Sequence, residues 1–148
     1  MSKEIERKFL VISDSYRTCS TECHHIIQGY LCRDVDATVR VRITDNNAYL
    51  TIKGRNSGII RDEWEYPIPL GDARAILDKC AQGNIIEKTR YIVPEKDNLK
   101  WEIDEFHGAH AGLVVAEIEL PDTSASIHTP DFIGKEVSGD PTYYNSNL

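Results

Sequence analysis

The sequence has no apolar run that approaches the roughly 20 residues of a membrane-spanning helix. The N-terminal stretch also lacks the apolar centre of a signal peptide, because Glu4 and Glu6 interrupt it. Cysteine is scarce, with four residues in the chain, and without an export signal these thiols are expected to stay reduced. We therefore expect a cytoplasmic protein that does not enter a membrane.

Positive charge is also in short supply, since 24 acidic residues outnumber 17 basic ones and give a formal net charge of -7. Nonspecific nucleic-acid binding depends on basic side chains that neutralise phosphates, so we expect no nucleic-acid partner. A small anionic ligand stays possible, because a local basic site or a bound metal can reverse the sign of the charge. The length of 148 residues predicts one domain, 1–148, with a core of its own.

One stretch, CSTECHH, places two cysteines and two histidines close together, at Cys19, Cys23, His24 and His25. Its spacing matches none of the familiar zinc modules, and a second Cys/His pair at a suitable distance is missing. We therefore expect ordinary reduced thiols here rather than a zinc site.

What the sequence does contain is charge that alternates along extended segments. Glu4, Glu6 and Lys8 fall on every second position, so a strand presents them on one face. Near the far end of the chain, Glu117 and Glu119 repeat the acidic part of this pattern. Two acidic pairs of this kind suit hard divalent cations, which prefer oxygen ligands.

Eight extended segments are predicted from alternation and from the turn residues between them. They cover 3–11, 24–33, 38–43, 48–53, 61–68, 84–94, 99–106 and 114–120. A helix is predicted over 70–82, with Asp72 as its N-cap and Gly83 as its stop, and short helical turns after Ser13 and over 131–135. No βαβ rhythm is present, so the predicted fold is mainly β (α+β), with an antiparallel, closed sheet and a few short helices outside.

The two faces of these strands leave two interpretations open. In the ordinary one, the apolar faces form the core and the charged faces are solvated. However, the charges are sorted by strand: Arg40 and Arg42 form one basic segment, and Lys88 and Arg90 form another. A water-filled barrel whose lining binds both a metal and a polyanion reconciles this sorting with the cost of burying unpaired charge.

The acidic opening motif Glu-x-Glu-x-Lys, present as Glu4, Glu6 and Lys8, is followed by seven further stretches and a distinctive C-terminus. In order they are QGYL at 28–31, VRVR at 39–42, TIKG at 51–54, EWEY at 63–66, EKTRY at 87–91, WEIDEF at 101–106, AEIEL at 116–120 and the terminal GDPTYYNSNL. This series resembles the CYTH family, also called the triphosphate tunnel metalloenzymes. The resemblance spans essentially the whole chain.

The resemblance implies a fold, an activity and partners. The expected fold is a closed eight-stranded antiparallel β-barrel that forms a tunnel, with charged side chains pointing inward. The expected activity is metal-dependent hydrolysis of inorganic tripolyphosphate, because the chain is most similar to bacterial tripolyphosphatases, which are usually homodimers. Two alternatives stay open: a hydrolase or cyclase acting on ATP or thiamine triphosphate, and a non-catalytic module that binds polyphosphate or nucleotides.

The resemblance, together with side-chain chemistry, assigns roles within the tunnel. Hard oxygen ligands for Mg²⁺ or Mn²⁺ would come from Glu4, Glu6, Glu117 and Glu119, with Glu63, Glu65 and Asp104 as supporting candidates. Phosphate oxygens, which guanidinium groups bind in a bidentate manner, would be held by Lys8, Arg40, Arg42, Lys53, Arg61, Lys88 and Arg90.

Lys8 and Tyr30 are the catalytic candidates, because the resemblance pairs this tyrosine with the motif lysine. The sequence does not distinguish two roles for Lys8. In one role, cations and Tyr30 around Lys8 lower its pKa, so that the neutral amine accepts a proton from water. A fixed ammonium that binds phosphate or pairs with Glu6 is the alternative.

Four aromatic residues have expected positions of their own. Trp64 and Trp101 are expected to pack outside the barrel, against the 70–82 helix or a partner subunit, with stacking on a nucleobase at the tunnel mouth as the alternative. Tyr143 and Tyr144 are expected to anchor the C-terminal segment, with substrate contact as the alternative.

Overall fold

The computed structural model describes residues 2–148; Met1, which belongs to the predicted 1–148 domain, lies outside the described residues. Strands dominate, and helices are few and short. The elements are β1 (Ser2–Val11), α1 (Tyr16–Cys19), β2 (Glu22–Asp34), β3 (Ala37–Thr44), β4 (Asn47–Gly54), β5 (Ile60–Ile68), α2 (Leu70–Cys80), β6 (Gln82–Pro94), β7 (Lys100–Phe106), η1 (Gly108–His110), β8 (Val114–Glu119), β9 (Ile133–Glu136), η2 (Pro141–Tyr143) and η3 (Asn145–Asn147).

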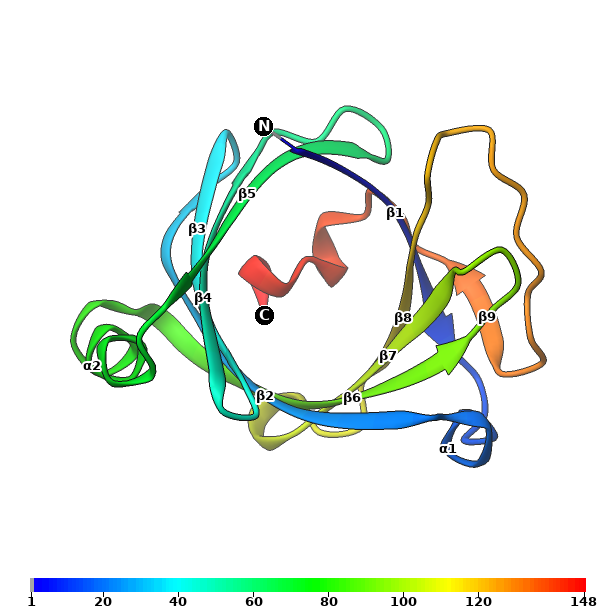
Figure 1. Ribbon diagram of the computed structural model, residues 1–148, viewed down its shortest axis with the longest axis horizontal. Helices are drawn as coiled ribbons and strands as arrows, with labels where there is room; N and C mark the ends of the chain where they lie inside the picture. The colour runs from blue at the N-terminus through cyan, green and yellow to red at the C-terminus, as the bar shows by residue number, and fades with distance from the viewer. Residues whose placement is uncertain (1) are drawn as a thin grey trace.

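The strands form a single antiparallel sheet that closes on itself. Their order is β5-β4-β3-β2-β6-β7-β8-β1, and pairing of β5 with β1 completes the ring (Figure 1). The ninth strand, β9, pairs with the C-terminal part of β1 and lies outside the ring. The predicted mainly β fold, a closed eight-stranded antiparallel barrel with short helices outside, is therefore confirmed.

Two local predictions are wrong. The helix α2 begins at Leu70 after Pro69, so Asp72 lies in its first turn instead of capping it. It ends at Cys80, and Gly83, with φ 68°, lies inside β6 instead of stopping the helix. The helical turn predicted over 131–135 is mostly strand, because β1 offers a free edge there to which β9 adds backbone hydrogen bonds.

The outer face of β1, β6, β7 and β8 carries the largest apolar cluster. Phe9, Trp101 and Ile118 belong to it, and Trp101 is fully buried. Tyr16 of α1 and Phe132, just before β9, cover this face from outside the barrel. Trp101 thus packs outside the barrel as predicted, but with Phe9 and Phe132 and not against α2, whose apolar residues belong to another cluster.

The interior of the barrel changes character along its axis. A smaller apolar cluster contains Tyr30, Ile86, Phe106 and Val115, which share strand faces with charged side chains further along the same strands. The C-terminal segment enters the barrel, as Figure 1 shows, and Leu148 packs against this cluster together with Tyr143. One end of the interior is therefore filled by apolar side chains, and the charged part opens toward the other end.

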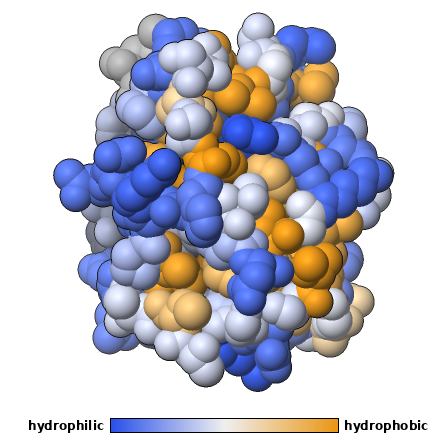
Figure 2. Space-filling view, turned by 90° about the vertical axis from the view of Figure 1, so that its right-hand side faces the viewer, coloured by the Kyte–Doolittle hydropathy of each residue, from blue (hydrophilic) through white to orange (hydrophobic). Residues whose placement is uncertain are grey.

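Figure 2 shows the molecule from the side of β8 and β9, where apolar side chains emerge in several separate places among polar ones. Within residues 2–148, no helix has the length and apolar character needed to cross a membrane.

The helix α2 packs on the barrel at Gly29, and this contact gives a first test of the structure. A Cβ at Gly29 would lie 2.9 Å from both Ile85 Cδ1 and Leu77 Cδ2. We expect Gly29→Ala to lower the free energy of unfolding by about 1–2 kcal/mol, because these side chains must shift. Gly71 of α2 has open space around it, so Gly71→Ala should instead raise stability by about 0.5 kcal/mol. Urea denaturation of both variants checks the pair; equal effects would contradict the packing described.

Candidate active site

The charged part of the interior encloses a cavity of about 280 Å³. It is lined by inward-facing side chains from β1 to β8 and by the C-terminal segment. The predicted site residues among its lining are Glu4, Glu6, Lys8, Tyr30, Arg40, Arg42, Lys53, Arg61, Glu63, Glu65, Arg90, Glu117 and Glu119. Lys88 and Asp104, the remaining predicted residues, are buried in the wall beside the cavity.

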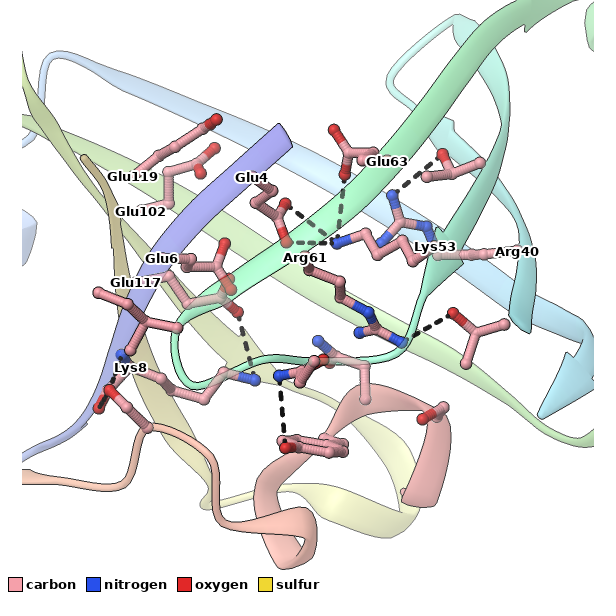
Figure 3. Close-up of a pocket in the computed structure, with 18 of the residues that line it drawn as sticks. Glu4, Glu6, Lys8, Arg40, Lys53, Arg61, Glu63, Glu102, Glu117 and Glu119 are labelled. Atoms are coloured by element: carbon pink, nitrogen blue, oxygen red, sulfur yellow. Dashed lines mark hydrogen bonds and ion pairs between the residues drawn. The ribbon is translucent and has the colours of Figure 1, made fainter. Parts of the chain in front are cut away.

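Strand pairing explains how distant motifs meet here. Lys8 of β1 lies opposite Glu117 of β8, and Glu6 lies opposite Glu119. Because alternate residues share a face, these register pairs bring the N-terminal motif and the AEIEL motif onto one wall. Figure 3 shows their carboxylates gathered on one side of the cavity, with Lys53 and Arg40 on the other.

The carboxylates of Glu4, Glu6, Glu117 and Glu119 form one side of the cavity, called here the acidic wall. Their negative charge exceeds the positive charge of the lysines that pair with them. Burial, followed by repulsion from Glu117 and Glu4, raises the pKa of Glu6 well above its usual range. Burial and three neighbouring carboxylates, with Glu4 the strongest, likewise raise the pKa of Glu119. Carboxylates that repel one another in this way are stabilised when a cation lies among them.

This donor set fits a hard divalent cation. Every candidate ligand on the wall is a carboxylate oxygen, the ligand type that Mg²⁺ and Mn²⁺ prefer. Within residues 2–148, no three acidic, histidine or cysteine side chains converge to hold a metal by themselves. The carboxylates therefore suit a metal ion that also takes ligands from water and from substrate oxygens, as Mg²⁺ commonly does.

Most cations of the cavity have a carboxylate partner. Lys53 lies 3.1 Å from Glu4 and 3.3 Å from Glu63. Arg90 binds Asp104 through two nitrogens, at 2.7 and 2.9 Å. These pairs hold the side chains in fixed positions. They also connect the acidic wall to the basic wall, which is formed by Arg40, Arg42 and Arg61.

Two guanidinium groups differ from the rest. Among the described residues, no carboxylate lies within ion-pair distance of Arg42 or Arg61. Arg61 donates to the Gly54 carbonyl at 2.6 Å and to Thr38 Oγ1 at 3.2 Å. Burial, followed by repulsion from Arg40 and Arg90, lowers the pKa of Arg42 to about 9. The basic wall thus has positive charge that an anion in the cavity can neutralise.

Of the two roles left open for Lys8, the one that needs a lowered pKa does not agree with the surroundings of this lysine. Burial alone would lower it, but attraction from Glu117 and Glu6 outweighs burial and raises the pKa of this lysine. Its Nζ lies 3.6 Å from Glu117 Oε1 and donates to the Tyr143 carbonyl at 3.0 Å, not to Tyr30. The buried lysine whose pKa burial does lower is Lys88, despite the Asp104 carboxylate 2.8 Å away.

Several cavity residues were not predicted. Glu102 lines the acidic wall and lies 3.1 Å from Arg90; its alternation with Asp104 was the available signal. Ser146 lines the cavity because the C-terminal segment folds back into the barrel, and no local pattern indicates that return. Tyr144 also lines the cavity, which agrees with the alternative of substrate contact considered for it. The expectation that this segment is anchored near Tyr143 agrees with the hydrogen bond from Lys8.

The CSTECHH stretch lies away from the cavity, at the outer surface. His24 Nδ1 is 2.6 Å from Asp45 Oδ2, and His25 Nε2 is 2.7 Å from Glu87 Oε2. Cys19 and Cys23 are exposed free thiols. Both histidines therefore have carboxylate side chains as their hydrogen-bond partners.

The protein is a closed antiparallel barrel, and carboxylates and guanidinium groups lie on facing walls of its interior. These features define a class of protein whose interior suits a compact polyanion. The chain belongs to the CYTH domain family, whose family model matches residues 2–144. It is 49% identical over 148 residues to an inorganic triphosphatase of Acetivibrio thermocellus, covering 100% of this chain and 94% of that protein.

Other comparisons agree with this assignment. An inorganic triphosphatase of Nitrosomonas europaea is 31% identical over 148 residues, covering 98% of this chain and 95% of that protein. A crystal structure of the inorganic triphosphatase NE1496 superposes with a TM-score of 0.67 at 29% identity, covering 99% of this chain and 94% of that one. The PH1012 protein of Pyrococcus horikoshii shares the fold, with a TM-score of 0.64 at 19% identity over 81% of this chain and 79% of that one.

Proposed function

We propose that this protein hydrolyses inorganic tripolyphosphate to pyrophosphate and phosphate, with Mg²⁺ or Mn²⁺ as its metal. The observation that carries the proposal is the cavity itself, in which a carboxylate wall faces guanidinium groups that lack carboxylate partners. The two relatives named inorganic triphosphatase, each matched over nearly its whole length, support the same activity.

The whole chain, 1–148, would act as one catalytic domain, since the cavity uses residues from Glu4 to Ser146. The homodimer and the cytoplasmic location that we expect from the sequence stay predictions.

The facing walls suggest how a triphosphate is bound. Arg40, Arg42 and Arg61 would hold phosphate oxygens by charge-assisted hydrogen bonds. Glu4, Glu6, Glu117 and Glu119 would hold the metal, with Glu63 and Glu65 nearby on β5 and Asp104 orienting Lys88 and Arg90. When bound, the divalent cation supplies charge neutralisation at the phosphate oxygens.

In the reaction, a water oxygen would form a bond to a terminal phosphorus while the anhydride bond to the departing pyrophosphate breaks, and the proton that the water loses would pass to a phosphate oxygen. The negative charge that collects on the phosphoryl oxygens needs fixed positive charge beside it. Lys8 meets this need because its raised pKa keeps it an ammonium. We therefore assign Lys8 the role of an electrostatic stabiliser, which its position 3.6 Å from Glu117 supports. Tyr30 lines the same cavity, where its hydroxyl would contact substrate.

The size of the cavity favours a compact substrate. At its far end, within residues 2–148, Phe106, Val115 and Leu148 pack together, so apolar side chains occupy the interior there. A nucleoside or thiamine group would have to remain at the open mouth, beyond the groups that bind phosphate. Inorganic tripolyphosphate places all of its charge within reach of both walls.

Phosphate release by the purified protein tests the proposal. With Mg²⁺ or Mn²⁺ present, we expect tripolyphosphate to be hydrolysed much faster than ATP, thiamine triphosphate or pyrophosphate. Removal of the metal with EDTA should abolish the release, because the carboxylate wall then repels the substrate. Preference for an organic triphosphate would replace the proposed substrate. Binding of tripolyphosphate without release of phosphate would show a binding module instead of an enzyme.

A further inference from the structure

The buried amide of Gln28 contacts one of the two guanidinium groups that lack a carboxylate partner. Gln28 lies on β2 on the same face as Tyr30, which lines the cavity, and it is fully buried. In the barrel wall it lies opposite Arg42 of β3 on one side and opposite Ile86 of β6 on the other. Arg42 Nε donates to Gln28 Oε1 at 2.8 Å.

The orientation of this amide follows from the chemistry of its partner. A guanidinium only donates hydrogen bonds, so the amide oxygen must face Arg42 and the amide nitrogen must face away. Gln28 Nε2 is buried and finds no hydrogen-bond partner among residues 2–148. Leaving a buried donor unpaired is unfavourable, so packing alone does not account for an amide at this position.

Apart from Arg61, which donates to Gly54 and Thr38, the other cations of the site are held by acids. Lys8, Arg40, Lys53, Lys88 and Arg90 each have a carboxylate within 3.6 Å. Arg42 is instead held by a neutral oxygen, which fixes the plane of the guanidinium without cancelling its charge. Its Nη1 and Nη2 groups donate no hydrogen bond within the described part of the chain. These two groups are therefore available for the bidentate contact with a phosphate that a guanidinium makes best.

From this geometry we propose that Gln28 is a positioning residue for substrate binding, which orients Arg42 toward the triphosphate while leaving its charge unneutralised. The inference rests on the proposed function, because Arg42 must bind the phosphate chain for its orientation to matter. Gln28 itself acts through Arg42 and not by contact with the reacting atoms.

Two substitutions at Gln28 separate this role from simple packing. Gln28→Met keeps the length of the side chain but removes the acceptor, and it should raise KM for tripolyphosphate about tenfold by loosening Arg42. Gln28→Glu keeps the acceptor and the size but places a carboxylate against Arg42. It should raise KM more, by about a hundredfold, because the new carboxylate then neutralises the charge of the Arg42 guanidinium. In both variants kcat should change much less than KM.

A double substitution tests whether the effect passes through Arg42. In an Arg42→Lys background the ammonium cannot form the planar contact, so adding Gln28→Met should change KM little further. Gln82→Met serves as the matched control, because Gln82 is exposed on β6, and its KM should equal that of the unsubstituted protein. Melting temperatures measured in parallel report whether each variant folds. If Gln28→Met fails to fold, Gln28→Glu carries the test.

The outcomes distinguish the inference from the proposed function. A rise in KM that is larger for Gln28→Glu than for Gln28→Met, and that vanishes with Arg42→Lys, is the expected result. Unchanged KM in both variants, or equal rises that persist with Arg42→Lys, would overturn the positioning role. If the unsubstituted protein does not hydrolyse tripolyphosphate, the proposed function fails independently of any Gln28 result.

Discussion

Glu117→Gln should lower kcat/KM for tripolyphosphate by at least about a hundredfold, the largest loss expected for a near-isosteric change in this protein. Burial opposes the charged form of Glu117, but Lys8, a hydrogen bond with Glu6 and the more distant Arg90 hold its pKa well below the usual range. Glu117 thus favours its charged form at the centre of the acidic wall, where it is only 7% exposed. The amide removes that charge while it keeps the shape.

The loss should depend on metal concentration. Because a wall with one carboxylate fewer binds a divalent cation more weakly, half-maximal activation by Mg²⁺ should shift to higher concentration. Glu136→Gln is the matched control: this glutamate pairs with Arg7 outside the barrel at 2.7 Å, and its loss should leave kcat/KM nearly unchanged. Steady-state phosphate release across a Mg²⁺ series measures both. Full activity of Glu117→Gln at ordinary Mg²⁺ would remove this residue from the metal site.

Lys8→Ala is the second substitution with a large expected effect. Its kcat should fall by about a hundredfold or more, whereas KM should stay within about threefold, because fixed charge that stabilises the transition state acts mainly on turnover. The ammonium is held between the carboxylate of Glu117 and the carbonyl of Tyr143, so it is already in place before substrate binds. Lys3→Ala, on the opposite face of β1 and paired with Asp62, is the control that should change neither constant.

A third variant distinguishes the two roles considered for this lysine. Lys8→Arg keeps a positive charge but cannot give up a proton near neutral pH. Turnover well above that of Lys8→Ala would support an electrostatic role, and turnover as low as that of Lys8→Ala would support proton acceptance. A Lys8→Ala protein with normal kcat and a raised KM would instead limit Lys8 to holding the ground-state substrate.

Much of the site follows from the two-residue period of a strand. Once Glu4 is assigned to a cavity face, Glu6 and Lys8 must share that face, and the same holds for Arg40 with Arg42. Alternation by itself did not say whether that face is inside or outside. The resemblance to a family made that choice, and the closed barrel agrees with it.

Other features depend on contacts between distant segments and could not be read from any single stretch. The direction of the Lys8 pKa shift depends on which charges come nearest, and strand register brings Glu117 closer than the cations. Gln28 carries no charge, so nothing in QGYL indicates that its amide holds Arg42. The return of Ser146 into the barrel likewise has no local signature.

The sequence alone therefore indicated the eight strands of the barrel and the sorting of charge among them, because these follow from local spacing and side-chain chemistry, whereas the family resemblance supplied the inward face and most of the candidate roles. Only the tertiary structure decided which charges neutralise one another and which stay available to a ligand. Electrostatic interaction depends on distance and burial, which are set when the ring closes and the C-terminal segment enters it. Arg42 shows the difference: its neighbours in sequence are basic and apolar, but its orientation is set by Gln28 on the adjacent strand.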